Sequence, residues 1–345
     1  MNQFYLNEID SVFIIAELSA NHNQNKDIAI ATIKAAKKAG ADAIKLQTFT
    51  PDTITLDCRN EYFNINHGTI WDGKNLHDLY KEAYTPWEWH DELFSIARDQ
   101  GLVCFSTPFD KTSVDFLEDL NTPLYKIASP EITDIPLIKY VASKKKPIIL
   151  SSGIARIEDL QLAIDTIRQE GNNEIAILKC TTSYPTLPEE ANLITISDLK
   201  NKFQVIPGLS DHTLGILAPV VAVSFGAKII EKHFILDKTV GGPDVDFSLD
   251  FKEFKQMVEA IRIAEKLIGK VDYSLNSKVV KVRELGSRSL FVVKDIKAGE
   301  KFTESNIRSI RPGYGLHPKH YNDVLGKFAK IDLIKGTPLY FKDIV

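Results

Sequence analysis

The stretch 205–233, VIPGLSDHTLGILAPVVAVSFGAKIIEKH, decides the fold class. Its apolar, β-branched runs at 205–210 and 228–233 predict two strands, and the small apolar residues between them predict a helix. Two strands connected by a helix pair in parallel, because the helix returns the chain to the starting edge of the sheet. The stretch therefore predicts one strand–helix–strand unit of an α/β protein.

Polar side chains stand where the two strands of this unit end. Ser210 and His212 follow the first strand, and Glu231 and His233 close the second. Adjacent parallel strands lie about 4.8 Å apart, so side chains that leave the same ends can meet at one ion. Two imidazoles in this position predict a metal site that carboxylate, water or substrate oxygens complete. The alternative is that each histidine is an ordinary polar residue near a strand end.

Six more apolar runs precede this unit and alternate with segments that can form helices. They lie at 12–17, 43–47, 102–106, 123–128, 147–152 and 175–180. Eight strands with intervening helices in about 270 residues suit a (β/α)₈ TIM barrel, whose active site lies at the carboxyl ends of the strands. An open, doubly wound sheet is the structural alternative.

The helix that closes the barrel is predicted to start at Asp250, an N-cap residue with Glu253 three positions later. Its expected buried face comprises Phe254, Met257, Val258, Ile261, Ala264 and Leu267. Beyond this helix the pattern changes to short strands punctuated by glycine. We therefore expect a barrel domain at 1–270, a linker at 271–285 and a small domain at 286–345.

The tail contains an internal repeat. The segments DIKAGEKFTESNI (295–307) and DLIKGTPLYFKDI (332–344) align without gaps, with Asp first, Gly fifth and Ile last. A domain of about sixty residues has little hydrophobic core. We expect it to dock on its own barrel or on a partner's barrel.

Residues 50–84 form a long polar insertion after the second strand. So long a segment without clear periodicity is functional or disordered, and its aromatic content favours a loop that folds over a site. Thr85, Pro86 and Glu88 then predict the N-cap, first turn and capping-box acid of a helix that ends near Gly101.

Composition places the chain among soluble globular proteins. Its 345 residues are 44% hydrophobic and 26% charged, with a formal net charge of −4. That charge offers no basic field for nucleic acid or an anionic membrane, so we expect small-molecule partners. The start lacks the pattern of a signal peptide and the longest apolar stretch is too short for a bilayer, so we expect a cytoplasmic location. Cys58, Cys104 and Cys180 fit neither a disulfide framework nor a zinc ribbon.

Polar side chains also gather at the predicted carboxyl ends of the other strands. They are Glu17, Asn21, His22, Lys45, Gln47, Ser106, Thr107, Lys126, Ser129, Glu131, Ser151, Ser152, Lys179 and Thr181. Lysines and hydroxyls around one centre predict a site for a small polyanion that is phosphorylated, carboxylated or both. The alternative for a single lysine is a solvated position on the rim. Asp244, on the turn 241–244, would stand at the same rim as a turn former or as a catalytic group.

Nine motifs follow one another through the barrel segment. They are FIIAELSANHN (13–23), GADAIKLQTF (40–49), STPF (106–109), YKIASPE (125–131), ILSSG (149–153), CTTSYPT (180–186), GLSDHT (208–213), EKHF (231–234) and GGPD (241–244). In these motifs the chain resembles the sialic acid synthase family, the phosphoenolpyruvate-dependent synthases of nonulosonic acids. The tail, with KDIKAGE (294–300) and RPGYGLHP (311–318), resembles that family's antifreeze-like SAF domain. The resemblance implies a TIM barrel followed by such a domain.

The resemblance also implies a role for each residue that matches a family motif. His212 and His233 would bind a divalent metal, manganese or magnesium. The expected substrate-binding residues, most of them for phosphoenolpyruvate, are Lys45, Gln47, Lys126, Ser129, Ser151, Thr182 and Ser210. The expected catalytic residues, which contact the sugar or move protons, are Glu17, Glu131, Asp244 and Arg311.

Arg311 matches an arginine that the family's C-terminal domain delivers to the active site of the other protomer in a swapped homodimer. The chain departs from the family pattern at two positions. Thr182 stands in place of Asn or Ser, and Pro130 stands in place of a residue that is often Gly.

Four stretches, 70–80, 84–90, 247–250 and 311–318, resemble the pseudaminic acid branch of the family. That branch implies condensation of phosphoenolpyruvate with the open-chain aldehyde of 2,4-diacetamido-2,4,6-trideoxy-L-altrose. N-acetylneuraminate and legionaminate synthesis are the neighbouring alternatives. A Schiff-base pyruvate aldolase, with Lys126 or Lys179 as nucleophile, and a non-catalytic sugar-binding barrel are alternatives of other classes.

Overall fold

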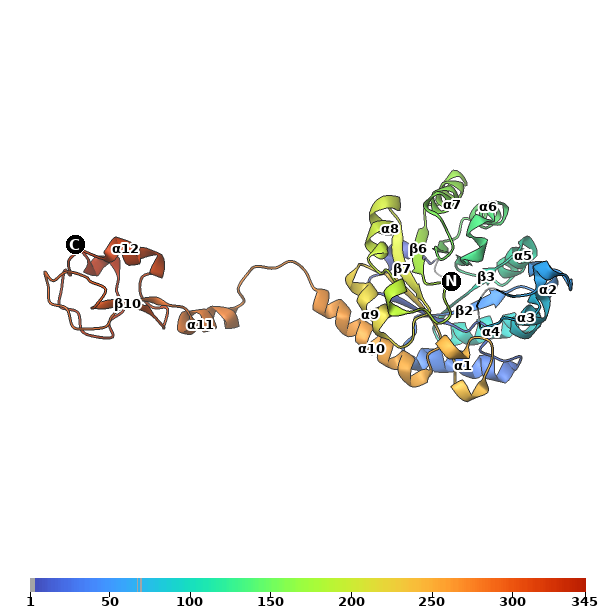
Figure 1. The fold of residues 1–345 in the computed structure, drawn as a ribbon, viewed down its shortest axis with the longest axis horizontal. Helices are drawn as coiled ribbons and strands as arrows, with labels where there is room; N and C mark the ends of the chain where they lie inside the picture. Colours follow the sequence, from blue (N-terminus) through green and yellow to red (C-terminus); the bar gives the residue numbers. More distant parts are fainter. Residues whose placement is uncertain (1–3, 67, 69) are drawn as a thin grey trace. The chain divides into compact units, whose positions relative to one another are not determined.

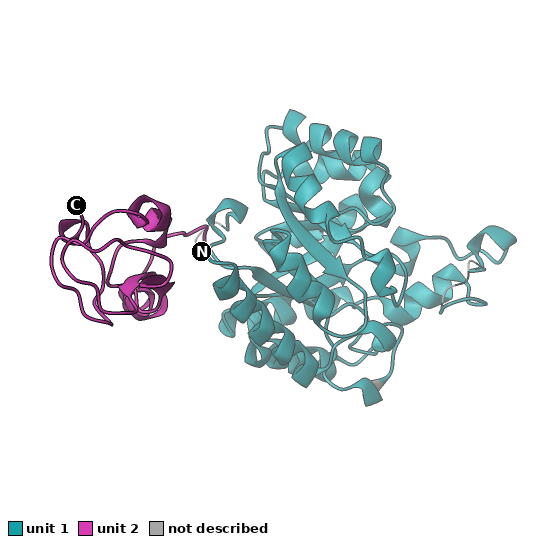
Figure 2. Cartoon of the chain, turned by 60° about the vertical axis from the view of Figure 1, so that its left-hand side comes forward, with its two compact units in different colours: residues 1–269 teal, residues 270–345 magenta. Residues whose placement is uncertain are grey.

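The computed structural model describes residues 4–66, 68 and 70–345 and divides the chain into two compact units. Unit 1 comprises residues 1–269 and unit 2 comprises residues 270–345 (Figure 2). Within the described residues, no helix combines the length and the apolar character needed to cross a membrane.

In the described part of unit 1, eight parallel strands close into a barrel in which β8 pairs with β1 (Figure 1). The strands are β1 (Phe13–Glu17), β2 (Ala43–Thr48), β3 (Val103–Pro108), β4 (Tyr125–Ile127), β5 (Ile148–Ser151), β6 (Ile175–Cys180), β7 (Ile206–Asp211) and β8 (Ile229–His233). The prediction of a TIM barrel is confirmed, and the alternative of an open sheet is wrong.

Helices surround the barrel on its outer side (Figure 1). They are α1 (Lys26–Ala39), α4 (Trp87–Asp99), α5 (Lys111–Asp119), α6 (Ile135–Ser143), α7 (Ile157–Gln169), α8 (Thr195–Phe203), α9 (Leu217–Ser224) and α10 (Phe251–Ile268). The capping box at the start of α10 forms as predicted, since Glu253 N donates to Asp250 Oδ1 at 2.8 Å and Asp250 N donates to Glu253 Oε2 at 3.0 Å. The predicted burial of Leu267 is wrong. Leu267 and Ile268 are 80% and 51% exposed, because the last turn of α10 has left the core.

The insertion at 50–84 contains more regular structure than its sequence indicates. It includes α2 (Pro51–Ile54) and α3 (Leu76–Ala83), and Asn75 caps α3. The predicted cap of the next helix is also wrong. The N-cap of α4 is Pro86, without a side-chain cap. The hydroxyl of Thr85 is instead buried against His22 Nε2, at 3.1 Å, and is therefore not available to the helix.

Alternate strand positions fill the barrel interior. Its apolar cluster includes Phe13, Ile15, Ala43, Phe105, Leu124, Ile149, Ala176, Leu178 and Ile229. The positions between them face outward and pack against the helices in a larger cluster. Gly208 belongs to the inner face. A Cβ there would lie 2.4 Å from Leu178 Cδ2 and 2.5 Å from the carbonyl oxygen of Ile229, so only glycine fits.

Unit 2 contains α11 (Ser277–Gly286), β9 (Ser289–Val292), β10 (Ile307–Ile310) and α12 (Tyr321–Val324). Strands β9 and β10 pair in an antiparallel manner. Helix α11 occupies much of the segment that the sequence analysis assigns to a linker, and it has no buried residue.

The two repeats of the tail bind each other through equivalent atoms. Asp295, the first residue of one repeat, accepts a hydrogen bond of 2.7 Å from the backbone of Lys335. Asp332, the first residue of the other, accepts one of 2.9 Å from the backbone of Ala298. The shared aspartate therefore caps the opposite repeat in both cases.

Matching backbone geometry accompanies these caps. Ile296 and Leu333 exchange two backbone hydrogen bonds of 2.8 Å. The shared glycines, Gly299 and Gly336, have φ of 84° and 91°, which explains why the fifth position of both repeats is glycine.

Candidate active site

The alternation that fills the barrel core also turns the last strand residues inward. These inward residues at the carboxyl ends form the mouth of the barrel. They are Glu17, Lys45, Thr107, Lys126, Ser151, Cys180, Ser210, Glu231 and His233, and all but His233 are buried. Each lies an even number of positions beyond an inner-face residue, so one strand period explains the whole set.

Two lysines and two glutamates form an ion network in the mouth. Lys45 Nζ lies 2.5 Å from Glu17 Oε2 and 3.9 Å from Glu231 Oε2. Lys126 Nζ lies 3.3 Å from Glu231 Oε1, which also accepts a hydrogen bond of 2.9 Å from Ser210 Oγ. Glu17 Oε1 and Glu231 Oε2 are buried without a hydrogen-bond partner among the described residues. The network therefore has unused capacity for a proton or a polar ligand.

Burial and neighbouring charge separate the pKa values of the two glutamates. Burial raises the pKa of Glu17 to about 7 although Lys45 opposes the change. Burial acts on Glu231 in the same direction, but Lys126 and Lys45 outweigh it and lower the pKa of Glu231 to about 2. Burial lowers the pKa of Lys126, and Glu231 offsets this only in part. The two glutamates therefore differ in how readily they take a proton beside the same lysines.

The two predicted metal ligands lie side by side at the ends of β7 and β8, with ring centroids 5.2 Å apart. His212 Nδ1 lies 2.6 Å from the carbonyl oxygen of Thr181. A carbonyl can only accept, so Nδ1 carries the hydrogen, and Nε2 is the nitrogen left to bind an ion when the ring is neutral. Burial lowers the pKa of His212, but the hydrogen bond and charge of Cys180 outweigh it and raise that pKa. His233 Nδ1 is buried without a hydrogen-bond partner among the described residues, 3.7 Å from Asp244 Oδ2. Burial first, and then the positive charges around it, lower the pKa of His233 well below its usual value, which favours the neutral form of this ring.

This donor set fits a divalent cation that takes part of its shell from small molecules. Neutral imidazoles with free lone pairs bind such ions through bonds of about 2.1 Å. Among the residues that the structure describes, no group of three or more His, Cys, Asp or Glu side chains could hold a metal ion by itself. Water or substrate oxygens would complete the coordination of an ion on His212 and His233.

Aromatic rings enclose the histidine pair. Phe247, in the 3₁₀ helix Val245–Phe247, stands edge-on to His233 with centroids 4.8 Å apart. Tyr184 lies 4.4 Å from His212, and Trp71 lies 5.6 Å from Tyr184. The insertion at 50–84 therefore borders the mouth through Trp71.

The ends of β4 to β6 contribute hydroxyl groups. Ser151 Oγ is buried and has no hydrogen-bond partner among the described residues, whereas Ser129 Oγ accepts a bond of 3.0 Å from Gly153 N. A Cβ on Gly153 would lie 2.2 Å from Thr182 Cγ2 and 2.7 Å from Ser129 Oγ. Glycine thus lets the three loops approach one another. Thr182 itself is exposed.

Two further predicted site residues lie in different units. Gln47 is on the inward face of β2 and is half-buried. Arg311 is exposed and lies in unit 2, immediately after β10. Their roles remain those that the family resemblance implies.

Comparison with protein families accounts for both units. The NeuB family model matches residues 32–273, and the SAF domain model matches residues 287–345. The chain belongs to the NeuB family. This confirms the resemblance that the motifs indicate.

Similar proteins match along nearly the whole chain. A pseudaminic acid synthase from Campylobacter jejuni is 51% identical over 328 residues, which cover 95% of each protein. An N,N'-diacetyllegionaminic acid synthase from Legionella pneumophila is 35% identical and covers 96% of this chain and 94% of its own length. The crystal structure of a Bacillus subtilis spore coat polysaccharide biosynthesis protein has a TM-score of 0.66 at 36% identity, covering 100% of this chain and 99% of that one.

The site predicted from the NeuB-family motifs lacks a residue that the geometry places at its centre. Glu231 contacts Lys45, Lys126 and Ser210, but its position at the end of β8 led to no predicted role in the site. Its spacing of two from His233 was the available signal, because that spacing puts both on the inner face. Tyr184 and Phe247 were also missed, since aromatic residues near strand ends look like core.

Glu131 provides a pH-dependent test of the rim. Its Oε2 is buried without a hydrogen-bond partner among the described residues, and burial raises its pKa from 4.5 to about 7. The folded protein thus holds this proton more tightly, so the contribution of Glu131 to stability is complete below pH 4.5 and is lost as pH rises through about 7. We expect Glu131→Gln to raise the melting temperature more at about pH 8 than at about pH 5. The difference between the two effects should be roughly 2 °C.

Thermal unfolding followed by circular dichroism at both pH values measures this difference. Glu189→Gln, at an exposed position, is the matched control and should change both temperatures equally. An equal effect of Glu131→Gln at both pH values would contradict the prediction.

Proposed function

We propose that the protein catalyses the reaction of a pseudaminic acid synthase, condensing phosphoenolpyruvate with 2,4-diacetamido-2,4,6-trideoxy-L-altrose to give pseudaminic acid and phosphate. The observation that carries the proposal is the barrel mouth, where the two buried lysines lie near the adjacent imidazoles of His212 and His233. The similarity to the Campylobacter enzyme supports this choice of sugar over that of the legionaminate or N-acetylneuraminate synthases.

The ion network is suited to phosphoenolpyruvate. Lys45 and Lys126 would neutralise its phosphate and carboxylate in a buried site, where electrostatic interactions are strong. Glu231 sits between the two ammonium groups and keeps them oriented without a ligand. The hydroxyls of Ser129 and Ser151 would add directional hydrogen bonds.

The condensation forms a carbon–carbon bond and breaks a carbon–oxygen bond. A divalent ion, manganese or magnesium, on His212 and His233 would supply Lewis acidity for the sugar carbonyl. The methylene carbon of phosphoenolpyruvate attacks the aldehyde carbon, whose oxygen takes a proton. Water captures the positive charge on carbon 2 and loses a proton, and phosphate then leaves from the tetrahedral intermediate.

Carboxyl groups around the mouth are placed to move these protons. Burial raises the pKa of Glu17 and of Glu131 to about 7, and it also raises the pKa of Asp244. A carboxyl that titrates near neutral pH can both give and take a proton, which typically contributes about 10²–10⁴-fold to a rate.

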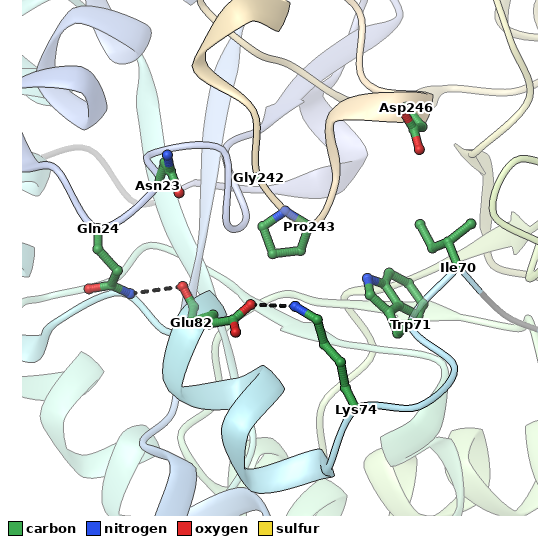
Figure 3. Close-up of a pocket in the computed structure, with 9 residues that line it drawn as sticks. All are labelled: Asn23, Gln24, Ile70, Trp71, Lys74, Glu82, Gly242, Pro243 and Asp246. Atoms are coloured by element: carbon green, nitrogen blue, oxygen red, sulfur yellow. Dashed lines mark hydrogen bonds and ion pairs between the residues drawn. The ribbon is translucent and has the colours of Figure 1, made fainter. Parts of the chain in front are cut away.

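An open pocket next to the mouth would receive the rest of the sugar (Figure 3). It has a volume of about 430 Å³. Ile70, Trp71 and Pro243 give it an apolar wall, and Trp71 joins it to the mouth through Tyr184. Pro243 belongs to the turn that carries Asp244.

The polar wall of this pocket carries paired charges. Glu82 lies 2.5 Å from Lys74, and its backbone carbonyl accepts a bond of 3.1 Å from the amide of Gln24 (Figure 3). Paired charges and an apolar wall suit a neutral sugar with acetamido and methyl groups better than a second anion.

Trp71→Ala is expected to weaken the binding of the sugar. Loss of the ring should raise KM for the diacetamido hexose by about tenfold, equivalent to about 1.4 kcal/mol, with KM for phosphoenolpyruvate unchanged. Steady-state phosphate release measures both constants. Tyr62→Ala, in the same insertion and 80% exposed, is the control and should change neither. An equal rise in both constants would disprove the assignment of the pocket.

We also propose a swapped homodimer in which Arg311 reaches the mouth of the partner. Residues 1–270 then serve as the catalytic barrel, 271–285 as the connection and 286–345 as the antifreeze-like domain. Exposed apolar side chains on α11, Val282 at 68% and Leu285 at 64%, support a surface that another chain covers. The free state of Cys58, Cys104 and Cys180 supports a reducing, cytoplasmic location.

One assay tests the proposed reaction directly. The protein is incubated with phosphoenolpyruvate, manganese and each candidate hexosamine in turn while inorganic phosphate is followed. We expect release with the trideoxy diacetamido sugar only. Release with N-acetylmannosamine alone would reassign the substrate, and trapping of a pyruvate adduct by borohydride would indicate an aldolase instead.

A further inference from the structure

A buried ion pair stands behind the two histidines, on the outer face of the barrel wall. Asp211 and Lys232 are directly opposite each other in the β7–β8 ladder. Asp211 immediately precedes His212, and Lys232 immediately precedes His233. Because strand residues alternate, both point away from the mouth, and their side chains are 0% exposed.

The ammonium group of Lys232 anchors the loop that follows β7. Its Nζ donates to Asp211 Oδ2 at 2.5 Å and to the carbonyl oxygen of Thr213. Asp211 in turn accepts bonds of 3.1 Å from the backbone N and from the hydroxyl of Thr213. His212 therefore lies between two residues bound to one ammonium group. Its own N–H donates to Thr181 Oγ1 at 3.0 Å.

Stability gives little reason for charges at this place. Removing an ammonium and a carboxylate from water is costly, and apolar side chains of similar volume are often as stable or more stable. An ion pair with several hydrogen bonds is more directional than an apolar contact. It fixes both the distance and the direction between the segments that carry it.

We propose that Asp211 and Lys232 are positioning residues that hold His212 and His233 at the separation and orientation that a divalent cation needs. The proposal rests on the metal ligation assigned to the two histidines above. Neither Asp211 nor Lys232 touches the ion or a substrate, and both act through the backbone on either side of the rings. Loss of groups that orient metal ligands typically costs about 10–100-fold in metal affinity or activity.

The double variant Asp211→Leu/Lys232→Met tests the proposal without leaving an unpaired buried charge. Binding of Mn²⁺ to the metal-stripped, full-length protein is measured from the electron paramagnetic resonance signal of free Mn²⁺. We expect the dissociation constant to rise about tenfold or more, while KM for phosphoenolpyruvate at saturating Mn²⁺ stays unchanged. A folded double variant that binds Mn²⁺ as tightly as the wild type would overturn the proposal.

Two further variants separate positioning from folding. Arg262→Met removes another ion pair, in which Arg262 lies 2.8 Å from Asp42 and 2.7 Å from the carbonyl oxygen of Val12. It should lower the melting temperature and leave Mn²⁺ affinity unchanged. Thr213→Val removes one bond to Asp211 and keeps the pair, so it should fold and weaken Mn²⁺ binding by a smaller factor. If the double variant does not fold, Thr213→Val decides the question. An unchanged affinity of this variant for Mn²⁺ would then overturn the proposal.

The wild-type protein distinguishes this proposal from the assignment on which it rests. Wild-type protein that fails to bind Mn²⁺ would refute ligation by His212 and His233, and the positioning role with it. Tight binding by the wild type together with equal binding by the variants would refute the positioning role alone.

Discussion

Turnover is expected to disappear when His212 is replaced by alanine, with the fold retained. The variant loses the ring whose Nε2 would bind the proposed metal, because Nδ1 donates to the carbonyl oxygen of Thr181. Polarisation of a carbonyl by a bound ion contributes several kcal/mol. Since each 1.36 kcal/mol is a factor of ten, we expect a loss of about 10³-fold or more in kcat. Phosphate release at saturating Mn²⁺ measures the loss.

A second buried histidine serves as the matched control. His90 lies outside the mouth, with Nε2 2.9 Å from Thr48 Oγ1 and Nδ1 3.2 Å from the carbonyl oxygen of Pro86. His90→Gln should lower the melting temperature and keep turnover. A His212→Ala protein that remains active without added metal would refute the proposed role.

The second large effect is expected for Arg311→Ala. Removing one group that stabilises the developing charge of a transition state typically costs about 10²–10³-fold in kcat, and Arg311 is the guanidinium that the resemblance brings to the mouth. If it comes from the partner, mixing this variant with Lys126→Met should restore activity. Random reassortment makes half of the dimers mixed with one complete site each, so up to about a quarter of wild-type activity should return.

Arg308→Ala is the matched control, because Arg308 is an exposed arginine of the same unit. It should keep activity both alone and in the mixture. Mass spectrometry shows when subunit exchange is complete. If the mixture then remains inactive, Arg311 acts within its own chain.

The barrel and much of its mouth follow from the period of the sequence. A strand such as β1 is buried on both faces, so it appears as the continuous run Phe13–Glu17, and the alternation of two then fixes which residues share the interior. Lys45, Lys126 and His233 were found because a charged or polar residue at the end of such a run is unusual.

Other features depend on what surrounds a residue in space. Leu267 has the helical spacing of a core residue, but it lies in the last turn of α10, where Leu267 and Ile268 are both exposed. Thr85 has the local pattern of a cap, yet a buried imidazole, that of His22, takes its hydroxyl. Glu231 became central only when the register set it opposite Ser210 and near both lysines. None of these neighbours is close in the sequence.

The reciprocal aspartate caps of the tail hold its two repeats together and leave the segment between the repeats, which carries Arg311, outside this contact. Asp295 and Asp332 each cap the opposite repeat, so unfolding of either repeat removes a cap from the other. The span between the halves, 308–331, carries Arg311 and is pinned at Leu316, whose backbone bonds both Leu290 and Leu339. The two paired repeats thus form a scaffold that does not depend on the sequence of the segment between them. That segment can change in length or in the side chain it carries while the paired repeats stay the same.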